Sequence, residues 1–140
     1  MELKKYVGVL VKNGDKCLLC KRNAEGSFPG MWSLPAGKIE KNENSRDAAV
    51  REFKEETDID LERKNLEFVG LLPRISRDNS KIKGYMYVYE YFTEVPLIPD
   101  LENAVDGEEH TECGYFKVSQ ILKMETGEHL KKFLKNILYK

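Results

Sequence analysis

The sequence predicts an α/β or α+β sandwich built as one domain over residues 1–140. Short segments rich in β-branched and aromatic residues alternate with segments whose apolar residues recur at helical spacing. The chain has 140 residues, the usual size of one domain, and it shows no internal repeat, low-complexity tract or linker.

The first 22 residues predict a β-hairpin. Residues 6–12 are apolar and β-rich, Asn13-Gly14 is a typical hairpin turn, and residues 16–21 form the returning strand. Residues 26–37 follow. They are rich in Gly and Pro and contain the only tryptophan, Trp32.

A helix is expected over residues 45–57. Asn44 stands at the N-cap position, and Asp47 three residues later nearly completes a capping box. The elements expected after this helix are strands at residues 66–72, 85–95 and 112–117, an acidic loop at 96–107, and helices at 118–123 and 128–138.

The charge balance argues against a nucleic-acid-binding or membrane-binding surface. The chain has 23 Lys and Arg against 24 Asp and Glu, a net charge of −1. The longest aliphatic stretch near the start, residues 9–11, is too short for a signal peptide or a membrane span. We therefore expect a cytoplasmic protein with no membrane partner.

The three cysteines are expected to be reduced and structural. Cys17 and Cys20 lie in a predicted strand, where a spacing of three places their side chains on opposite faces. Cys113 stands alone, so the four converging ligands of a zinc site are missing.

Three carboxylates share one side of the predicted helix. At about 100° per residue, Glu52, Glu55 and Glu56 fall within roughly one 100° arc. Such a stripe repels itself unless a cation neutralises it, and oxygen ligands without His or Cys suit a hard ion such as Mg²⁺ or Mn²⁺. The alternative is a solvated helix face with i, i+4 ion pairs.

The stripe belongs to a longer pattern, G-x5-E-x7-R-E-U-x-E-E-x-G-U, in which U is apolar. The residues that match it in register are Gly37, Glu43, Arg51, Glu52, Phe53, Glu55, Glu56 and Ile59. Residues 37–59 therefore resemble the Nudix box. The hairpin and the later strands follow the family's order, so the resemblance implies one Nudix domain at 1–140. Its fold would be a mixed β-sheet sandwiched between α-helices.

Two positions depart from the family pattern. Asp58 replaces the late glycine, which ends the helix in a left-handed conformation that Asp adopts at a cost of about 1 kcal/mol. Ala36 stands where many members have a second glycine before Gly37. We expect the first change to affect stability more than catalysis, because no metal ligand is lost.

The resemblance implies a pyrophosphohydrolase that uses Mg²⁺, with Mn²⁺ as the alternative ion. Water would attack a phosphorus of a nucleoside diphosphate linked to another group, X. The metal ligands implied are Glu52, Glu55 and Glu56, with the backbone carbonyl of Gly37 as a further one.

The resemblance also implies roles for other charged residues. Arg51 would orient carboxylates, first of all Glu43. The general base is either Glu55 or Glu109, and the neighbouring acids of the later loop are Glu108 and Glu112.

Three residues outside the box are candidates for substrate binding. Arg22 resembles a family position that reaches substrate phosphate, with a surface cation as the alternative. Phe28 and Trp32 precede the box and would line a substrate pocket or pack in the core. Less weight falls on Arg74, Arg77 and His110, which we expect to be exposed, and on an alternating run of tyrosines at 85–91, which is typical of a core or a dimer contact.

The expected partner is a small nucleotide, with a nucleoside triphosphate as the first choice. A nucleoside diphosphate sugar or a dinucleoside polyphosphate is the alternative substrate. An RNA 5′ end is the one nucleic acid left open, and so is a homodimer. The competing functional classes are a Nudix-like domain that binds nucleotides without turnover and a nucleic-acid-binding module.

Overall fold

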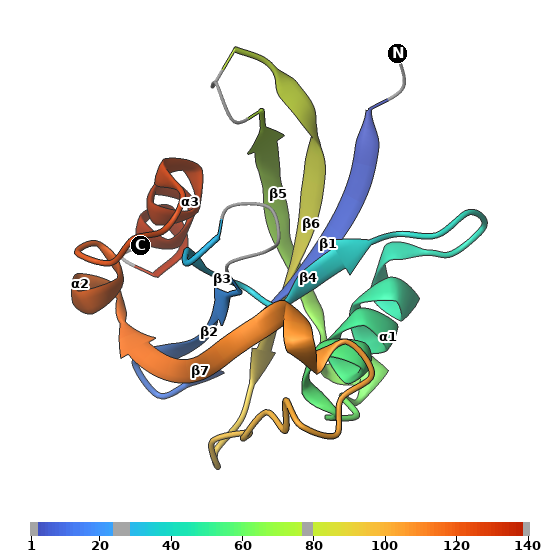
Figure 1. Cartoon of the computed structure of the whole chain (residues 1–140), viewed down its shortest axis with the longest axis vertical. Helices are drawn as coiled ribbons and strands as arrows, with labels where there is room; N and C mark the ends of the chain where they lie inside the picture. Colours follow the sequence, from blue (N-terminus) through green and yellow to red (C-terminus); the bar gives the residue numbers. More distant parts are fainter. Residues whose placement is uncertain (1–2, 24–28, 77–79, 139–140) are drawn as a thin grey trace.

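A mixed β-sheet forms the centre of the molecule (Figure 1) in a computed structural model that describes residues 3–23, 29–76 and 80–138. The strands in these ranges are β1 (Lys4–Asn13), β2 (Lys16–Arg22), β3 (Trp32–Ser33), β4 (Ala36–Lys38), β5 (Glu67–Ile75), β6 (Ile82–Phe92) and β7 (His110–Lys117). The main strand order is β3-β2-β1-β6-β5. β1 pairs with β6 in parallel and with β2 and β4 antiparallel, which confirms the mixed sheet.

The two strands of the first hairpin, β1 and β2, pair with each other only next to their turn. β1 and β2 pair at Lys12↔Cys17 and Asn13↔Lys16. Further along, β1 pairs with β4, where Val7 lies opposite Gly37, and β2 pairs with β7. This separation brings β4 and β7, which are far apart in the sequence, to the same region of the sheet.

Helices cover both faces of the sheet, as expected. α1 (Ser45–Thr57) packs on one face, where Phe53 meets Val7, Val9 and Leu18 in one core cluster. α2 (Val118–Ile121) and α3 (Glu128–Leu138) lie on the other side in Figure 1, where Leu134 and Ile121 join Leu10, Leu19 and Met86 in a second cluster. The described ranges also contain two short 3₁₀ helices. η1 (Arg63–Asn65) lies between α1 and β5, and η2 (Gly107–Glu109) directly precedes β7. None of the helices in the described ranges is long and apolar enough to cross a bilayer.

The ends of α1 follow the local signals in its sequence. The Asn44 side chain accepts a hydrogen bond of 2.8 Å from the backbone N–H of Asp47. Asp58 adopts a left-handed conformation with φ 63°, and its N–H donates to the Lys54 carbonyl at 2.9 Å. Both predictions for this helix are confirmed.

Three tyrosines of β6 pack against the core on the α1 face. Tyr89 is buried, with Oη 2.6 Å from Ser45 Oγ, and Tyr87 and Tyr91 are half-buried beside it. Tyr85 is half-buried and lies outside this cluster. β5 and β6 are longer than predicted at their shared turn, because the ladder continues through Arg74↔Gly84 and Ile75↔Ile82.

The prediction of three reduced cysteines was wrong. Cys20 on β2 and Cys113 on β7 lie directly opposite each other, with Cα atoms 4.0 Å apart, and form a disulfide. The two residues are 93 positions apart in the chain, so their contact depends on a strand register that sequence spacing does not reveal. Cys17 is a buried free thiol, as expected.

Candidate active site

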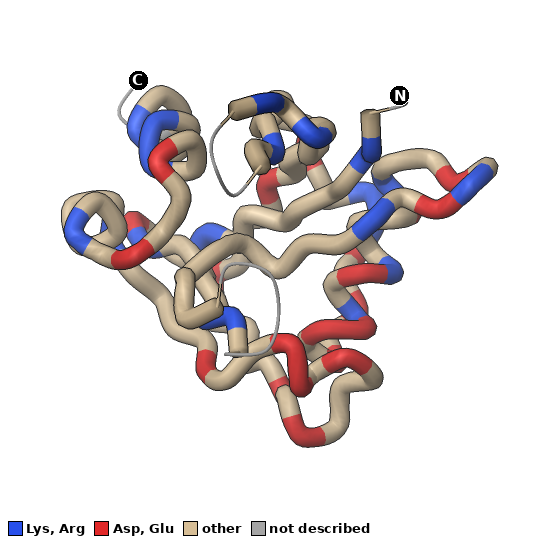
Figure 2. Tube along the Cα trace, turned by 45° about the horizontal axis from the view of Figure 1, so that its top comes forward, with Lys and Arg blue, Asp and Glu red and all other residues tan. Residues whose placement is uncertain are grey.

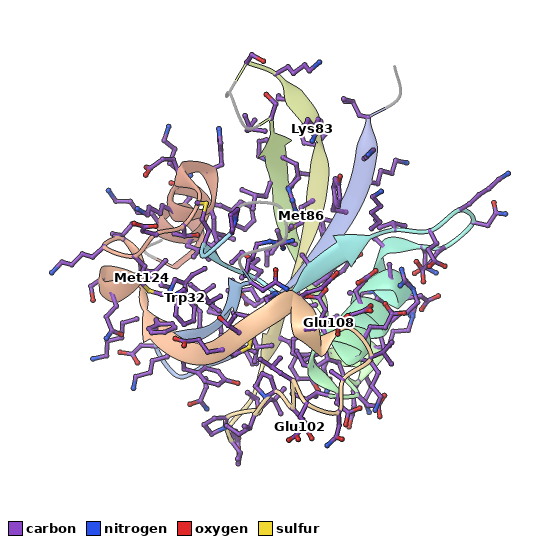
Figure 3. The ribbon with its side chains drawn as sticks, viewed as in Figure 1. Trp32, Lys83, Met86, Glu102, Glu108 and Met124 are labelled. Carbon is purple, nitrogen blue, oxygen red and sulfur yellow. A yellow bond between two sulfur atoms is a disulfide. The ribbon has the colours of Figure 1, made fainter. Side chains whose placement is uncertain are left out.

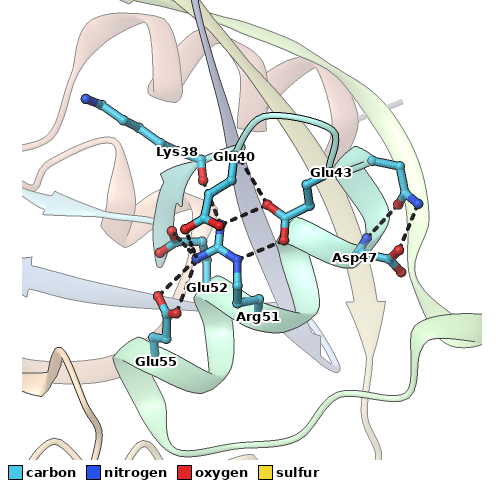
Figure 4. Close-up of polar contacts among 8 residues, drawn as sticks. Lys38, Glu40, Glu43, Asp47, Arg51, Glu52 and Glu55 are labelled. Carbon is cyan, nitrogen blue, oxygen red and sulfur yellow. Dashed lines mark hydrogen bonds and ion pairs between the residues drawn. The ribbon is translucent and has the colours of Figure 1, made fainter.

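Arg51 is the centre of a carboxylate cluster on α1 (Figure 4). Its guanidinium holds both oxygens of Glu43, with Nε to Oε2 at 2.8 Å and Nη2 to Oε1 at 2.9 Å. Nη1 donates to Glu52 Oε1 at 2.9 Å and to Glu55 Oε2 at 3.2 Å, and Nη2 donates to the Lys38 carbonyl at 2.9 Å. The expected contact between Arg51 and Glu43 is therefore present, and the same guanidinium joins α1 to the end of β4.

Gly37 lies directly against the Glu52 carboxylate. A Cβ atom at Gly37 would be 2.1 Å from Glu52 Cδ and 2.0 Å from Oε2, closer than real Cβ atoms approach other atoms. The absence of a side chain at this point lets the backbone of β4 approach the carboxylate stripe.

Glu56 is buried behind this stripe, with 1% of its surface exposed. The backbone N–H of Ala36 donates to Oε1 at 3.3 Å, and within the described ranges Oε2 has no hydrogen-bond partner. His110 at the start of β7 is also buried, with Nε2 3.6 Å from Glu56 Oε1, so the prediction that His110 is exposed was wrong. Burial and the nearby charge of Arg22 lower the pKa of His110 to about 4, so its imidazole is neutral near pH 7.

The η2 turn brings Glu109 to the same cluster. The Asp106 N–H donates to the Glu55 carbonyl at 2.7 Å, which attaches this loop to the end of α1. On the other side, the Asn23 N–H donates to the Glu109 carbonyl at 3.0 Å. Figure 3 shows the neighbouring Glu108 beside α1.

Crowded negative charge changes the titration of these acids. Burial raises the pKa of Glu56 well above the ordinary carboxyl value, and the charges of Glu109 and Glu52 raise it further. Burial also raises the pKa of Glu52 and of Glu109. Glu43 is the exception, because its hydrogen bonds from Arg51 lower its pKa. Figure 2 shows acidic positions concentrated along α1 and the loop that leads to η2.

The donor set fits a hard divalent cation. It consists of carboxylate and backbone oxygens, and the buried Glu56 Oε2 is an acceptor without a donor. Within the described ranges, no three His, Cys, Asp or Glu side chains already converge as a ligand group. Glu52 and Glu55 do not converge with Glu56, because their carboxylates accept hydrogen bonds from Arg51.

A cavity of about 670 Å³ lies on the α3 side of the sheet, and one of its lining residues, Ala36, donates its backbone N–H to Glu56. Arg22 and Trp32, two of the predicted substrate-binding residues, line it. Trp32 also packs edge-on against Phe116, with ring centroids 5.1 Å apart, so it contributes to both the core and the cavity wall. Figure 3 labels Trp32 and Met86, which both line the cavity. Phe28 lies outside the described residues.

Two residues that line the cavity, Arg74 and Thr126, were not predicted from the sequence to do so. Arg74 was expected to be exposed beside a polar turn, but its guanidinium stacks on Tyr6 at 4.7 Å from the ring centroid and lines the cavity. Thr126 carried no sequence signal and is 5% exposed. Arg77 lies outside the described residues.

Comparison with known proteins identifies similar chains. The sequence model of the NUDIX domain matches residues 2–137. The CTP pyrophosphohydrolase of Escherichia coli (strain K12) is 35% identical over 60 residues, 43% of this chain and 44% of that protein. The nucleoside triphosphatase NudI of Enterobacter sp. (strain 638) is 33% identical over 86 residues, 61% of this chain and 57% of that protein. The chain thus spans about half the length of the curated relatives that it matches.

Solved structures show the same fold. A MutT NUDIX hydrolase from Burkholderia pseudomallei superimposes with a TM-score of 0.79 at 23% identity, covering 98% of this chain and 99% of that one. At this level of identity, the likeness supports the fold.

Proposed function

Because the chain belongs to the NUDIX domain family, we propose that it is a divalent-metal-dependent pyrophosphohydrolase. The reaction is hydrolysis of the diphosphate linkage in a nucleoside diphosphate attached to a group X, with Mg²⁺ as the ion and Mn²⁺ as the alternative. The observation that carries the proposal is the buried Glu56 carboxylate. Its Oε2 has no hydrogen-bond partner among the described residues, and the Glu52 carboxylate lies near enough for its charge to raise the pKa of Glu56.

The metal would be held by Glu52, Glu55, Glu56 and the Gly37 carbonyl. A bound ion would neutralise the charge that gathers on the phosphoryl oxygens as water attacks. The role of Arg51 is to position Glu52 and Glu55, since one guanidinium donates to both carboxylates and is itself fixed by Glu43.

Glu109 is the favoured general base, with Glu55 as the alternative. The base takes a proton from the attacking water as the new P–O bond forms. Arg51 donates to both oxygens of Glu55, which leaves that carboxylate less free to accept a proton. The charge of Glu109 is among the main causes that raise the pKa of both Glu52 and Glu56, whereas Glu108 and Glu112 are not among the main causes of either shift.

The favoured substrate is a nucleoside triphosphate. The printed activities of the two curated relatives, CTP pyrophosphohydrolase and nucleoside triphosphatase, support this choice. The cavity beside the carboxylates has room for one nucleoside, and its mostly apolar wall suits an aromatic base. A nucleoside diphosphate sugar or a dinucleoside polyphosphate is the second candidate.

A turnover screen tests the proposal. The purified chain is incubated with nucleoside triphosphates, diphosphate sugars and dinucleoside polyphosphates, with and without Mg²⁺, and phosphate is measured after addition of pyrophosphatase or phosphatase. Metal-dependent release from one class is expected, and loss of that release in Glu109→Gln but not in Glu112→Gln would support Glu109 as the base. A folded protein that binds Mg²⁺ and a nucleotide without any release would contradict the hydrolase and favour a non-catalytic binding domain.

A further inference from the structure

Arg74 is a cationic side chain in the cavity that the proposed hydrolysis does not use. One face of its guanidinium is covered by Tyr6. In the part of the chain that the structure describes, the Arg74 side chain makes neither a hydrogen bond nor an ion pair. Burial lowers its pKa, and the charge of Arg22 adds to that effect. Its donors are therefore partly removed from water without a protein acceptor.

Thr126 is a second polar group without a partner in the same cavity. Thr126 is 5% exposed, and its Oγ1 has no hydrogen-bond partner among the residues that the structure describes. A buried hydroxyl in this situation costs free energy unless a ligand supplies the missing bond. Arg74 and Thr126 come from segments more than 50 residues apart in the sequence and meet at one cavity.

Apolar side chains form much of the remaining wall, and Arg22, Lys81, Glu128 and His129 line it as well. Leu34, Leu72, Met86 and Leu130 line the cavity together with Trp32, which suits a flat aromatic group. Ala36 lines the cavity too, and its N–H donates to Glu56 at 3.3 Å. Ala36 therefore lies between an aromatic group bound in the cavity and the Glu56 carboxylate, which is one of the proposed metal ligands.

We propose that this cavity selects nucleobases that present two adjacent hydrogen-bond acceptors, and that Arg74 binds this pair. The inference rests on the proposed function and names its substrate class. A guanidinium has donors only and binds a pair of acceptors with two parallel hydrogen bonds. Guanine offers O6 and N7, and cytosine offers O2 and N3. Adenine and uracil place a donor beside each acceptor on these edges, so they satisfy Arg74 less well.

Inorganic phosphate is the competing occupant, because Arg22 and Lys81 line the cavity as well as Arg74. The apolar side chains beside Arg74, such as Leu72, favour the flat ring of a base. The Thr126 hydroxyl can donate or accept at the remaining edge of that base.

The test uses the fluorescence of Trp32, the only tryptophan in the chain. GMP, CMP, AMP and UMP are titrated without metal, so that binding is measured apart from hydrolysis. GMP or CMP is expected to bind about tenfold to hundredfold more tightly than AMP and UMP. Weakened binding of 7-deaza-GMP would assign the preference to guanine, and weakened binding of 3-deaza-CMP would assign it to cytosine.

Variants separate Arg74 from the rest of the wall. Arg74→Met and Arg74→Lys should both lose the preference, because neither has a planar pair of donors, and thermal melting checks that each is folded. Arg63→Met, at an exposed arginine paired with Asp47, should keep it. The inference would be overturned by equal binding of the four nucleotides or by no saturable binding. It would also be overturned by equal competition from inorganic phosphate, or by folded Arg74 variants that keep the preference. Base-selective binding without Mg²⁺-dependent turnover would overturn only the hydrolase proposal.

Discussion

The guanidinium of Arg51 holds both carboxylate oxygens of Glu43, eight residues earlier in the chain, at 2.8 and 2.9 Å. The pair fixes the orientation of Arg51, whose remaining donors reach Glu52 and Glu55. A single side chain thereby sets the positions of two proposed metal ligands.

Replacing Arg51 with Lys should therefore lower activity without unfolding the chain. Lysine keeps the charge but cannot bind Glu43 with two parallel hydrogen bonds and reach Glu52 as well. We expect a loss of about 10- to 100-fold in kcat, with part of it recovered at high Mg²⁺, measured by phosphate release. Arg46→Lys on the same helix is the control. An unchanged rate in Arg51→Lys would show that Glu52 and Glu55 do not need this contact.

Glu56→Gln should remove at least about 100-fold of the Mg²⁺-dependent turnover, because an amide oxygen is a much weaker ligand than a carboxylate. The fold should remain intact, since Gln has nearly the same shape and Glu56 is already buried. Glu62→Gln, at an exposed position after α1, is the matched control. Retained activity in a folded Glu56→Gln variant would remove Glu56 from the metal site.

The same carboxylate predicts how stability depends on pH. Its pKa in the folded protein is raised, so the folded state binds this proton more tightly than the unfolded chain does. Without metal, the melting temperature of the wild type relative to Glu56→Gln should fall as pH rises above the ordinary carboxyl range toward neutrality. His110 acts in the opposite direction, because its pKa is lowered to about 4 in the folded protein, so the difference between the two proteins isolates the contribution of Glu56. Mg²⁺ should reduce the fall, because the ion binds only the folded state. A difference that rises over this range would contradict the burial of an unpaired Glu56.

Gly37→Ala should reduce both stability and activity. The added methyl group would lie 2.1 Å from Glu52 Cδ, so the Glu52 carboxylate or strand β4 must move. Combining it with Glu52→Ala should restore the melting temperature, because the clash is with that side chain, while activity stays low. Failure of the double variant to recover stability would mean that the backbone of β4, rather than Glu52, requires glycine.

Asp58→Gly should stabilise the protein with little change in rate. Asp58 has φ 63°, a conformation that glycine adopts without strain. We expect a gain of about 0.5–1 kcal/mol, which corresponds to roughly 2–4 °C in melting temperature for a chain of this size. Asp60→Gly is a close control, because Asp60 also pairs with Lys54 but does not have positive φ. A drop in melting temperature for Asp58→Gly would mean that the Lys54–Asp58 ion pair outweighs the backbone strain.

Much of the fold could be predicted from local patterns. Helix α1 has the predicted limits, since the spacing of its apolar residues and the caps at Asn44 and Asp58 act within one or two turns. The same spacing placed Glu52, Glu55 and Glu56 on one side of the helix, next to Arg51. The limits of the later strands were less accurate, because the β5–β6 ladder continues through residues that were assigned to a turn.

Local patterns were thus enough to predict the fold class, the helix that carries the carboxylates and the family. The folded chain was needed to see that Cys20 bonds to Cys113, that His110 is buried against Glu56, and that Arg74 and Thr126 line one cavity. Helix periodicity and capping involve neighbours in the chain, and their signals are written in adjacent residues. These other contacts join segments dozens of residues apart, and they depend on strand register and packing, which no local spacing encodes.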